Sequence, residues 1–372
     1  MRFAIITHVN HIQHADEYFG YAPYIREMNI WFKYVNEVII VAPLKIGEPT
    51  AIDIAYQQEK IDFRKVPDFS FTSFNNTLRS VFKLPVIFWN VFIAMKNADH
   101  IHLRCPGNMG LIGCFVQILF PNKSKTAKYA GNWDPKSRQP YTYKIQKWIL
   151  KNTFLTRNMH VLVYGNWDNQ SKNIKPFFTA TYSESEKRII TKRDFSDTIE
   201  FMFVGSLTPG KNPLYAIQLI QKLLDKGFNT SLSLFGEGNE GIYLENYIKT
   251  NKLEKNIILH GNKDKETLKK AYQKSHFVIL PSKSEGWPKA IAEGMFWSCL
   301  PIASKVSCVP FMLDYGNRGL LLEMNLDEDA DQIKEILKDE KAFFRKSSLS
   351  LKWSQDYTTD VFETEIKKLI YK

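Results

Sequence analysis

Short runs of Val, Ile and Leu alternate with longer helix-patterned segments through the first half of the chain. The strand-like runs are Arg2–Val9, Glu37–Ala42, Ile61–Val66, His100–Leu103, Thr126–Tyr129 and Met159–Val163. Continuous apolar runs of this length are typical of strands that are buried on both faces of a sheet. Alternation of such strands with helices indicates a doubly wound α/β sheet with parallel strands. We therefore predict an α/β domain over residues 1–182.

The same alternation begins again after residue 197 and predicts a second α/β domain over residues 198–352. Its strand-like runs are Thr198–Val204, Ser231–Phe235, Ile257–Leu259, Phe277–Leu280 and Leu300–Ala303. The segment 183–197 is polar and carries mixed charges, as a linker does. A final amphipathic helix is predicted within residues 353–372. Ligands of such folds bind at the carboxyl ends of the strands, so we expect the loops there, including 8–24, to line the site.

Length and composition agree with two globular domains and exclude several classes of protein. The 372 residues are 44% hydrophobic and 24% charged, which is typical of folded rather than disordered chains. The longest apolar run, Leu84–Met95, is interrupted by Pro85 and is shorter than the roughly 18–20 residues of a membrane-spanning helix. The first residues lack the apolar core of a signal peptide, so we expect a cytoplasmic protein.

Excess positive charge is concentrated in the first half of the chain. Residues 1–180 contain 22 Lys and Arg against 12 Asp and Glu, whereas the remainder contains 28 against 27. A basic half favours an anionic partner, such as a membrane surface, a nucleic acid or a phosphorylated substrate. The sequence contains no recognisable nucleic-acid-binding motif, so we do not expect a nucleic acid as the partner.

Residues 135–167 contain no Asp or Glu. Their six basic residues are Lys136, Arg138, Lys144, Lys147, Lys151 and Arg157, interleaved with Tyr141, Tyr143, Ile145, Trp148, Ile149 and Phe154. This composition is typical of a segment that lies on an anionic membrane surface. It also fits an amphipathic core helix with a basic outer face. Under the first interpretation the protein would be peripheral on the inner membrane.

Three groups of residues were considered as metal ligands, and none predicts a metal site. The four cysteines are Cys105, Cys114, Cys299 and Cys308, and no two have the spacing of a zinc site or a disulfide framework. His8, His11 and His14 have a helical spacing but follow a strand end, so they either line an acceptor cleft or are incidental loop residues. The acidic run Asp327–Asp331 is interpreted as a solvated helix start, where acids suit the helix dipole.

The segment from Leu280 to Met295 predicts chemistry most directly. A buried strand ends at Pro281, the loop after it carries Glu285, and Pro288 occupies a favoured position for the start of a helix. Glu293 then lies in the second turn of that helix. A helix N-terminus binds phosphate through its unpaired N–H groups, and carboxylates accept hydrogen bonds from sugar hydroxyls. A phosphate between two hydroxyl-bearing rings describes a nucleotide-sugar.

On these residues the sequence resembles glycosyltransferase family 4, whose Glu-x7-Glu motif Glu285 and Glu293 match. Further resembling blocks are Phe203-Val204-Gly205 with Lys211, Leu234 to Gly238, Leu259-His260-Gly261, Cys299 to Ser304, and Trp353 to Tyr357. The resemblance covers roughly residues 198–372 and is thin over 1–197. It implies the α/β GT-B fold, in which two Rossmann-like domains face a central cleft and the C-terminal helix returns to the first domain.

The resemblance also implies a reaction and roles by position. It implies retaining transfer of a sugar, without a metal or other cofactor, from a UDP- or GDP-linked donor to a glycan or lipid-linked acceptor in cell-surface polysaccharide synthesis. Glu293 would bind the donor ribose, Glu285 the sugar hydroxyls, and Lys211 the diphosphate leaving group. The other donor-binding residues implied are Gly205, Ser206, Gly236, Gly261, Asn262, Gly286, Trp287, Pro288, Lys289 and Ala290.

The sequence departs from the family pattern at two places. Ser206 stands where the family commonly has an arginine, and we hypothesise that Lys289 supplies the missing cation from the first turn of the helix. The stretch Lys128 to Asp134 lacks the histidine that often faces the donor sugar. Asn132 is the catalytic candidate there because it can hydrogen-bond a sugar hydroxyl, whereas only Asp134 could act as a base.

These departures leave two alternatives open. The protein could be a nucleotide-sugar epimerase of the same fold, which would convert its donor without an acceptor. It could instead be a non-catalytic donor-binding subunit, which would bind a donor without turnover.

Overall fold

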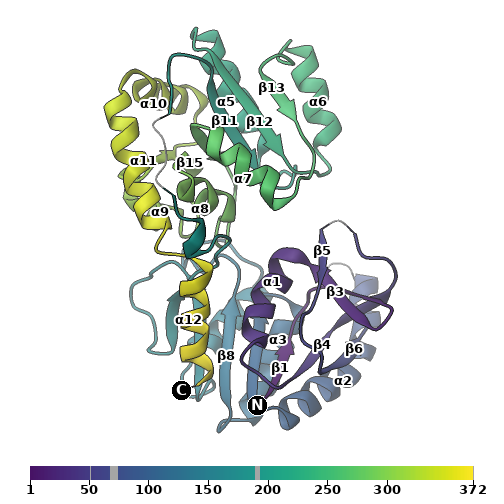
Figure 1. The fold of residues 1–372 in the computed structure, drawn as a ribbon. Helices are drawn as coiled ribbons and strands as arrows, with labels where there is room; N and C mark the ends of the chain where they lie inside the picture. The colour runs from purple at the N-terminus through teal and green to yellow at the C-terminus, as the bar shows by residue number, and fades with distance from the viewer. Residues whose placement is uncertain (51, 68–73, 189–192, 372) are drawn as a thin grey trace. The chain divides into compact units, whose positions relative to one another are not determined.

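The computed structural model describes residues 1–50, 52–67, 74–188 and 193–371, with backbone alone for 74–82. The chain divides into two compact units (Figure 1). Unit 1 comprises Met1–Phe178 and Phe362–Lys372, and unit 2 comprises Thr179–Val361. The C-terminal helix α12 (Thr359–Ile370) therefore ends in unit 1, whereas the segment 183–197, expected as a linker, belongs to unit 2.

Unit 1 is built on a ten-stranded sheet with the order β10-β9-β8-β7-β1-β4-β2-β3-β5, and β6 also pairs with β4. The strands are β1 (Arg2–Ile6), β2 (His11–His14), β3 (Glu17–Tyr21), β4 (Glu37–Ile46), β5 (Asp53–Ala55), β6 (Ile61–Val66), β7 (His100–Cys105), β8 (Ser124–Tyr129), β9 (Met159–Tyr164) and β10 (Ile174–Phe177). The strands predicted from apolar runs pair in parallel, with Ala4 of β1 opposite Ile39 and Ile101. This part of the prediction is confirmed.

Helices cover both faces of this sheet. Successive side chains of a strand point to opposite faces, so a continuous apolar run places apolar side chains on both faces, and each face needs a covering layer. The helices are α1 (Ala22–Phe32), α2 (Phe74–Asn97), α3 (Asn108–Val116) with the 3-10 turn η1 (Gln117–Leu119), α4 (Tyr141–Lys151), and the part of α12 in unit 1. Ala4 shares one buried cluster with residues of α2, α3 and α4. Its neighbour Phe3 contacts Trp31 of α1 at a ring distance of 5.7 Å. The layer of α2, α3 and α4 therefore lies on one face, and α1 lies on the other.

The segment 8–24 is not the open loop that the sequence suggested. Strands β2 and β3 form an antiparallel hairpin, and β2 pairs in parallel with the end of β4, with His11 opposite Leu44. The hairpin exists because β4 continues to Ile46, four residues beyond its apolar run, and so offers a pairing edge. Short polar strands of this kind carry no apolar run, so the pattern that identifies buried strands misses them.

Unit 2 contains a six-stranded, fully parallel sheet with the order β13-β12-β11-β14-β15-β16. The strands are β11 (Ile199–Val204), β12 (Thr230–Phe235), β13 (Ile257–Leu259), β14 (Phe277–Leu280), β15 (Leu300–Ser304) and β16 (Leu320–Leu322). The helices are α5 (Pro213–Asp225), α6 (Gly241–Thr250), α7 (Lys265–Lys274), α8 (Lys289–Phe296), α9 (Val309–Met312), α10 (Leu326–Lys338) and α11 (Glu340–Ser354), with 3-10 turns η2 (Glu184–Glu186) and η3 (Asp314–Gly316). The direction of strand order reverses between β11 and β14, which is where such sheets bind ligands.

The groups considered as metal ligands have other surroundings. His11 is buried and bonds to the Tyr56 hydroxyl at 2.8 Å, whereas His14 pairs with Glu48. Asp329 is buried, against the expectation of a fully solvated helix start, because its carboxylate accepts hydrogen bonds from Tyr215 and from two backbone amides. Among the residues that the structure describes, no group of three potential ligands is placed to hold a metal ion. Within the same residues, no helix has the length and hydropathy needed to traverse a bilayer.

Candidate functional site

An ion pair marks the point where the strand order of unit 2 reverses. β11 and β14 are neighbours, with Phe201 opposite Phe277, so the loops that follow them leave the sheet at the same edge. Lys211 lies in the first loop and Glu285 in the second, and Lys211 Nζ is 2.6 Å from Glu285 Oε1. The Glu285 side chain is 6% exposed and that of Lys211 is 30% exposed. Two of the three catalytic candidates of the sequence are thus brought into contact.

Backbone hydrogen bonds hold the two loops together. The Lys283 N–H donates to the Gly210 carbonyl at 2.9 Å, which joins the second loop to the first. The Lys211 N–H donates to the Thr208 carbonyl at 3.0 Å and closes a turn before α5 begins at Pro213. These backbone hydrogen bonds hold the two loops side by side, so that the lysine and the carboxylate are within reach of each other.

The second loop leads directly into the N-terminus of α8. The helix begins at Lys289, and Pro288 is its N-cap, one residue before the position expected from sequence. The Gly286 carbonyl accepts from the Ser307 hydroxyl at 3.3 Å and from the Cys308 thiol at 3.2 Å, which fixes the loop from outside. The first N–H groups of any α-helix have no partner within the helix. The loop therefore presents Glu285 beside a helix terminus that favours anions.

Glycines allow three loops of this edge to lie backbone against backbone. A Cβ at Gly236, whose φ is +137°, would lie 2.0 Å from the Gly205 carbonyl oxygen. The Gly236 N–H donates to the carbonyl of Gly261, which has a left-handed φ of +68°. These three predicted donor-site glycines are thus adjacent. A glycine is needed at position 236 because the loops approach one another closely there.

Ser206 and Asn262, the remaining loop residues predicted from the donor-site resemblance, lie on the same three loops. Ser206 is exposed, and its hydroxyl is 3.5 Å from that of Thr208. The Asn262 N–H donates to Glu237 Oε1 at 3.4 Å, so an acidic residue between the glycines orients this turn.

Glu293 has partners different from those of Glu285. Its carboxylate accepts from the Thr181 hydroxyl at 2.7 Å and from the Tyr272 hydroxyl at 3.2 Å. Burial raises the pKa of Glu293, and the hydrogen bond from Thr181 and the charge of Lys289 oppose that rise. Sequence reasoning did not identify Thr181 or Tyr272, since neither lies in a motif.

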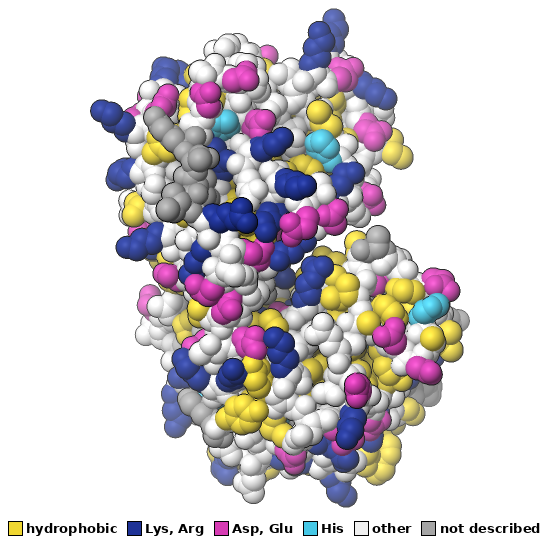
Figure 2. All heavy atoms as spheres, viewed as in Figure 1, with side chains coloured by type: hydrophobic (Ala, Val, Ile, Leu, Met, Phe, Trp, Pro, Cys, Tyr) yellow, Lys and Arg dark blue, Asp and Glu magenta, His cyan; other side chains and the backbone are white. Residues whose placement is uncertain are grey.

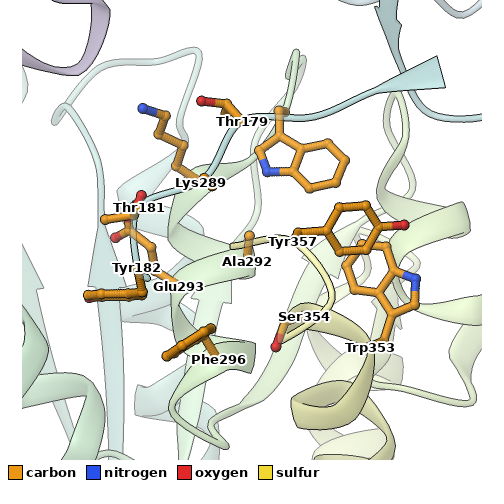
Figure 3. A pocket seen from close by; sticks show the side chains of 12 residues that line it. Thr179, Thr181, Tyr182, Lys289, Ala292, Glu293, Phe296, Trp353, Ser354 and Tyr357 are labelled. Carbon is orange, nitrogen blue, oxygen red and sulfur yellow. Dashed lines mark hydrogen bonds between the residues drawn. The ribbon is translucent and has the colours of Figure 1, made fainter. Parts of the chain in front are cut away.

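Glu293 and Lys289 line a hollow within unit 2 (Figure 3). Its wall is formed by Thr179, Ala180, Thr181, Tyr182, Trp287, Lys289, Ala292, Glu293, Phe296, Trp353, Ser354 and Tyr357. Figure 3 shows Lys289, Thr181 and Glu293 on the opposite side of the hollow from Trp353 and Tyr357. The rings of Trp353 and Tyr357 are in contact, with centroids 4.5 Å apart. Trp353 and Tyr357 thus form an aromatic wall, and the charged residues lie across the hollow from it beside the Tyr182 ring (Figure 3).

The third catalytic candidate, Asn132, belongs to unit 1. It follows β8, and its side-chain oxygen accepts from the Asp134 N–H at 2.9 Å. The Asp134 carboxylate in turn accepts from the Lys136 N–H at 2.8 Å. Between them Trp133 is buried and donates its indole N–H to Gln170. Both polar side chains thus order the loop that carries them.

Residues 185–350 match the protein family described as "Glycosyl transferases group 1". An uncharacterised glycosyltransferase of Methanocaldococcus jannaschii, MJ1178, is 32% identical over 141 residues, which is 38% of each chain. The capsular polysaccharide biosynthesis glycosyltransferase CapH of Staphylococcus aureus is 24% identical over 74% of this chain and 77% of its own. HepE of Anabaena, solved with UDP and glucose, superposes with a TM-score of 0.70 at 12% identity, over 100% of this chain and 99% of its own.

The fold is GT-B. The fold class expected from the sequence is thereby confirmed, including the C-terminal helix that ends in the first unit. The family match contains Lys211, Glu285 and Glu293, so the ion pair lies inside the matched region, whereas residues on both sides of that region also line the hollow.

Proposed function

We propose that this protein is a retaining glycosyltransferase. It moves a sugar from a UDP- or GDP-linked donor to a glycan or lipid-linked acceptor in the synthesis of a cell-surface polysaccharide. The observation that carries the proposal is the Lys211–Glu285 pair at the strand-order reversal, beside the N-terminus of α8 and inside the family match. The names of the relatives support the class, since CapH acts in capsular polysaccharide biosynthesis and HepE was solved with UDP and glucose.

Charge explains how the pair would act on a nucleotide-sugar. Breaking the bond between the sugar and the diphosphate leaves negative charge on the leaving group, and a preorganised cation lowers the cost of that charge. Lys211 supplies the cation and the α8 dipole adds to it, so the proposed reaction needs no metal. Glu285, held by Lys211 at 2.6 Å, keeps a lone pair for the hydroxyls of the sugar ring.

Glu293 is proposed to hold the ribose. An ionised carboxylate has about four lone-pair sites, and Thr181 and Tyr272 occupy two of them. The remaining sites suit a vicinal diol. Lys289 lies one turn before Glu293 on α8. It is proposed as the second cation, in place of the arginine that the family commonly has where this chain has Ser206.

Unit 1 is proposed to bind the acceptor. Asn132 offers its amide nitrogen to a sugar hydroxyl from the loop after β8, while its oxygen stays in the turn with Asp134. The basic character of this unit favours an anionic acceptor, such as a glycan linked to lipid by phosphate.

A donor screen tests the proposal. Nucleotide-sugars with different bases and sugars are added to the protein, and the melting temperature is measured. A ligand at 100 times its dissociation constant adds about 2.7 kcal/mol of stability. We expect a UDP- or GDP-sugar to raise the melting temperature, and Lys211→Ala to abolish that rise. Lys283→Ala, an exposed lysine of the adjacent loop, is the matched control and should keep it.

Turnover assays separate the alternatives. Release of the nucleoside diphosphate that needs an added acceptor supports transfer. Conversion of the donor sugar without an acceptor would instead make the protein an epimerase, and donor binding without turnover under any acceptor would make it a binding subunit. Lys289→Ala with unchanged donor affinity and turnover would remove Lys289 from the proposed site.

A further inference from the structure

The outer surface of α2, α3 and α4 in unit 1 carries large apolar side chains that the sheet does not cover. We call this surface the α2–α4 face, and its exposed apolar residues are Val86, Phe88, Trp89, Phe115, Leu119, Tyr141, Trp148 and Phe154. Trp89 is 64% exposed and Trp148 is 62% exposed, although indole rings are normally among the best-buried side chains. Exposure of several such residues on one layer indicates a surface that meets a partner.

These side chains follow the periodicity of the helices that carry them. On α4, Tyr141, Lys144 and Trp148 are spaced by three and four residues, which places them in one outward stripe. Ile149 and Leu150 of the same helix are fully buried in the core below. α4 is therefore a core helix whose outer stripe is basic and aromatic.

Ring contacts connect the helices of this face into one surface. Trp89 stacks on Phe92 of α2 with centroids 6.0 Å apart, and Phe92 meets Phe120, directly after η1, at 5.4 Å. Phe115 and Leu119 are four residues apart and both exposed, so they extend the surface along α3 and η1. The apolar side chains thus lie on helices packed side by side, whose inner residues share one core cluster.

The α2–α4 face is also basic. Residues 69–167 contain 13 Lys and Arg against two acidic residues, Asp99 and Asp134, and α2, α3 and α4 contain no acidic residue at all. Lys96, Lys144 and Arg157 are exposed among the apolar side chains. The Arg157 guanidinium stacks over the Phe154 ring at 4.7 Å, which places charge directly on the apolar surface.

We propose that the α2–α4 face docks on an anionic lipid bilayer and lies in the plane of its interface. Trp and Tyr prefer this depth because they have an apolar ring and a polar atom, and Lys and Arg beside them attract anionic headgroups. The complete lack of acids on three helices is the charge complementarity that selects this partner. Aliphatic residues such as Val86 and Leu119 would be buried at the boundary of the acyl chains, whereas a nucleic acid offers no apolar layer to bury them.

This docking deepens the proposed function, because a lipid-linked acceptor would lie in the same bilayer, and only that link rests on the proposed function. Binding of unit 1 to lipid can hold or fail by itself. Its measurement therefore uses no donor and no acceptor.

Vesicle flotation tests the proposal. The complete protein is mixed with vesicles of phosphatidylcholine alone or of phosphatidylcholine with phosphatidylglycerol, at low and high salt. We expect recovery with the anionic vesicles only, and weaker recovery at high salt. Because Trp89 and Trp148 lie on the face, tryptophan emission should shift to the blue and be quenched by brominated acyl chains.

Variants separate the apolar and the basic contributions. Trp89→Ser with Trp148→Ser should remove the quenching, and Lys144→Glu with Arg157→Glu should lower the partition coefficient by at least about fivefold for each charge lost. The matched controls are Tyr243→Ser and Lys249→Glu on α6 of unit 2. They replace an exposed aromatic residue and an exposed lysine outside the α2–α4 face and should leave binding unchanged. If Trp89→Ser lowers the melting temperature, Val86→Ser replaces it, and the expected result is then weaker recovery with anionic vesicles instead of lost quenching.

Three outcomes would overturn the proposal. They are equal recovery with neutral and anionic vesicles, no recovery with either, and a dimer in solution that the tryptophan variants dissolve. The last would show that a second protein surface covers the face. Donor-induced melting shifts in the same variants report on the proposed function, so the failure of one proposal is distinguishable from failure of the other.

Discussion

The two units share an α/β architecture but differ in how their charge is distributed. Unit 2 contains 25 Lys and Arg and 25 Asp and Glu, whereas unit 1 contains 25 against 14. Figure 2 shows the neutral pattern as basic and acidic side chains interspersed over unit 2. A balanced surface leaves specific contacts such as Lys211–Glu285 to select a ligand, whereas a net charge of +11 attracts anions over the whole unit.

The units also bury polar groups in different ways. In unit 1 the carboxylate of Glu27 lies 3.0 Å from the fully buried ammonium of Lys128 and 3.1 Å from the guanidinium of Arg104. Lys128 also donates to the Phe178 carbonyl and lies 4.9 Å from the Phe362 ring, so it contacts both chain segments where unit 1 ends. In unit 2, glycines allow the loops of the candidate site to lie backbone against backbone. A buried cluster of one carboxylate and two cations thus stabilises unit 1, and close backbone approach shapes the site of unit 2.

Breaking the buried charge cluster should have the largest effect on this contrast. Glu27→Gln leaves two buried cations without their anion, and removal of one partner of a buried pair costs about 3–5 kcal/mol. Hydrogen exchange should show faster opening of unit 1 peptides and unchanged unit 2 peptides. The control Glu37→Gln breaks the exposed pair with Arg2 and should cost about 0–1 kcal/mol. If the two variants lost the same free energy of unfolding, the buried cluster would not be what stabilises unit 1.

A methyl group at Gly236 should destabilise unit 2 and leave unit 1 unchanged. Gly236→Ala combines a positive φ with a contact of 2.0 Å to the Gly205 carbonyl, so we expect a loss above the roughly 1–3 kcal/mol of backbone strain alone. Gly227→Ala is the control, because its φ is +85° but nothing lies within 4 Å of the new Cβ. Denaturant unfolding followed by hydrogen exchange measures both. Similar losses for the two variants would argue against the close approach of the loops.

Acid should weaken unit 1 through its buried histidines. Burial lowers the pKa of His11 and of His100 to about 4, below the ordinary value of 6.5. The unfolded chain therefore binds protons first, and stability falls as the pH drops from 6.5 towards 4, by about 1.4 kcal/mol per pH unit for each group. His100→Gln removes one of the two groups and should reduce this slope. A slope unchanged by His100→Gln would contradict the assignment.

The pH dependence of Glu293 should run in the other direction and be smaller. Its pKa is raised by burial, so stability is fully present below the pKa of the unfolded chain and is lost as pH rises through the pKa of the folded protein. Glu293→Gln keeps an acceptor for Thr181 and Tyr272 but cannot ionise. We expect unfolding measurements to show the variant gaining on the native protein as pH rises. A difference that does not change with pH would mean that the carboxylate is not desolvated.

Much of the fold could be read from the chain because its signals are local. Apolar runs such as Glu37–Ala42 are continuous since both faces of a parallel strand are covered, and this property belongs to the segment itself. Lys211 and Glu285 were predicted from a family resemblance, whereas their contact depends on β11 and β14 being neighbours in the sheet, which the structure shows. The hairpin β2–β3 escaped prediction, since its stability comes from pairing with β4 rather than from its own residues.

The linear order of residues was thus enough to identify two α/β units, the motif residues Glu285 and Glu293, and the basic bias of the first unit. The tertiary structure alone decided which atoms Glu293 bonds, why Gly236 must be glycine, and that the apolar and basic residues of α2, α3 and α4 share one surface. The physical reason is range. Strand burial and helix periodicity act between near neighbours in sequence, whereas these features depend on groups that only packing brings together.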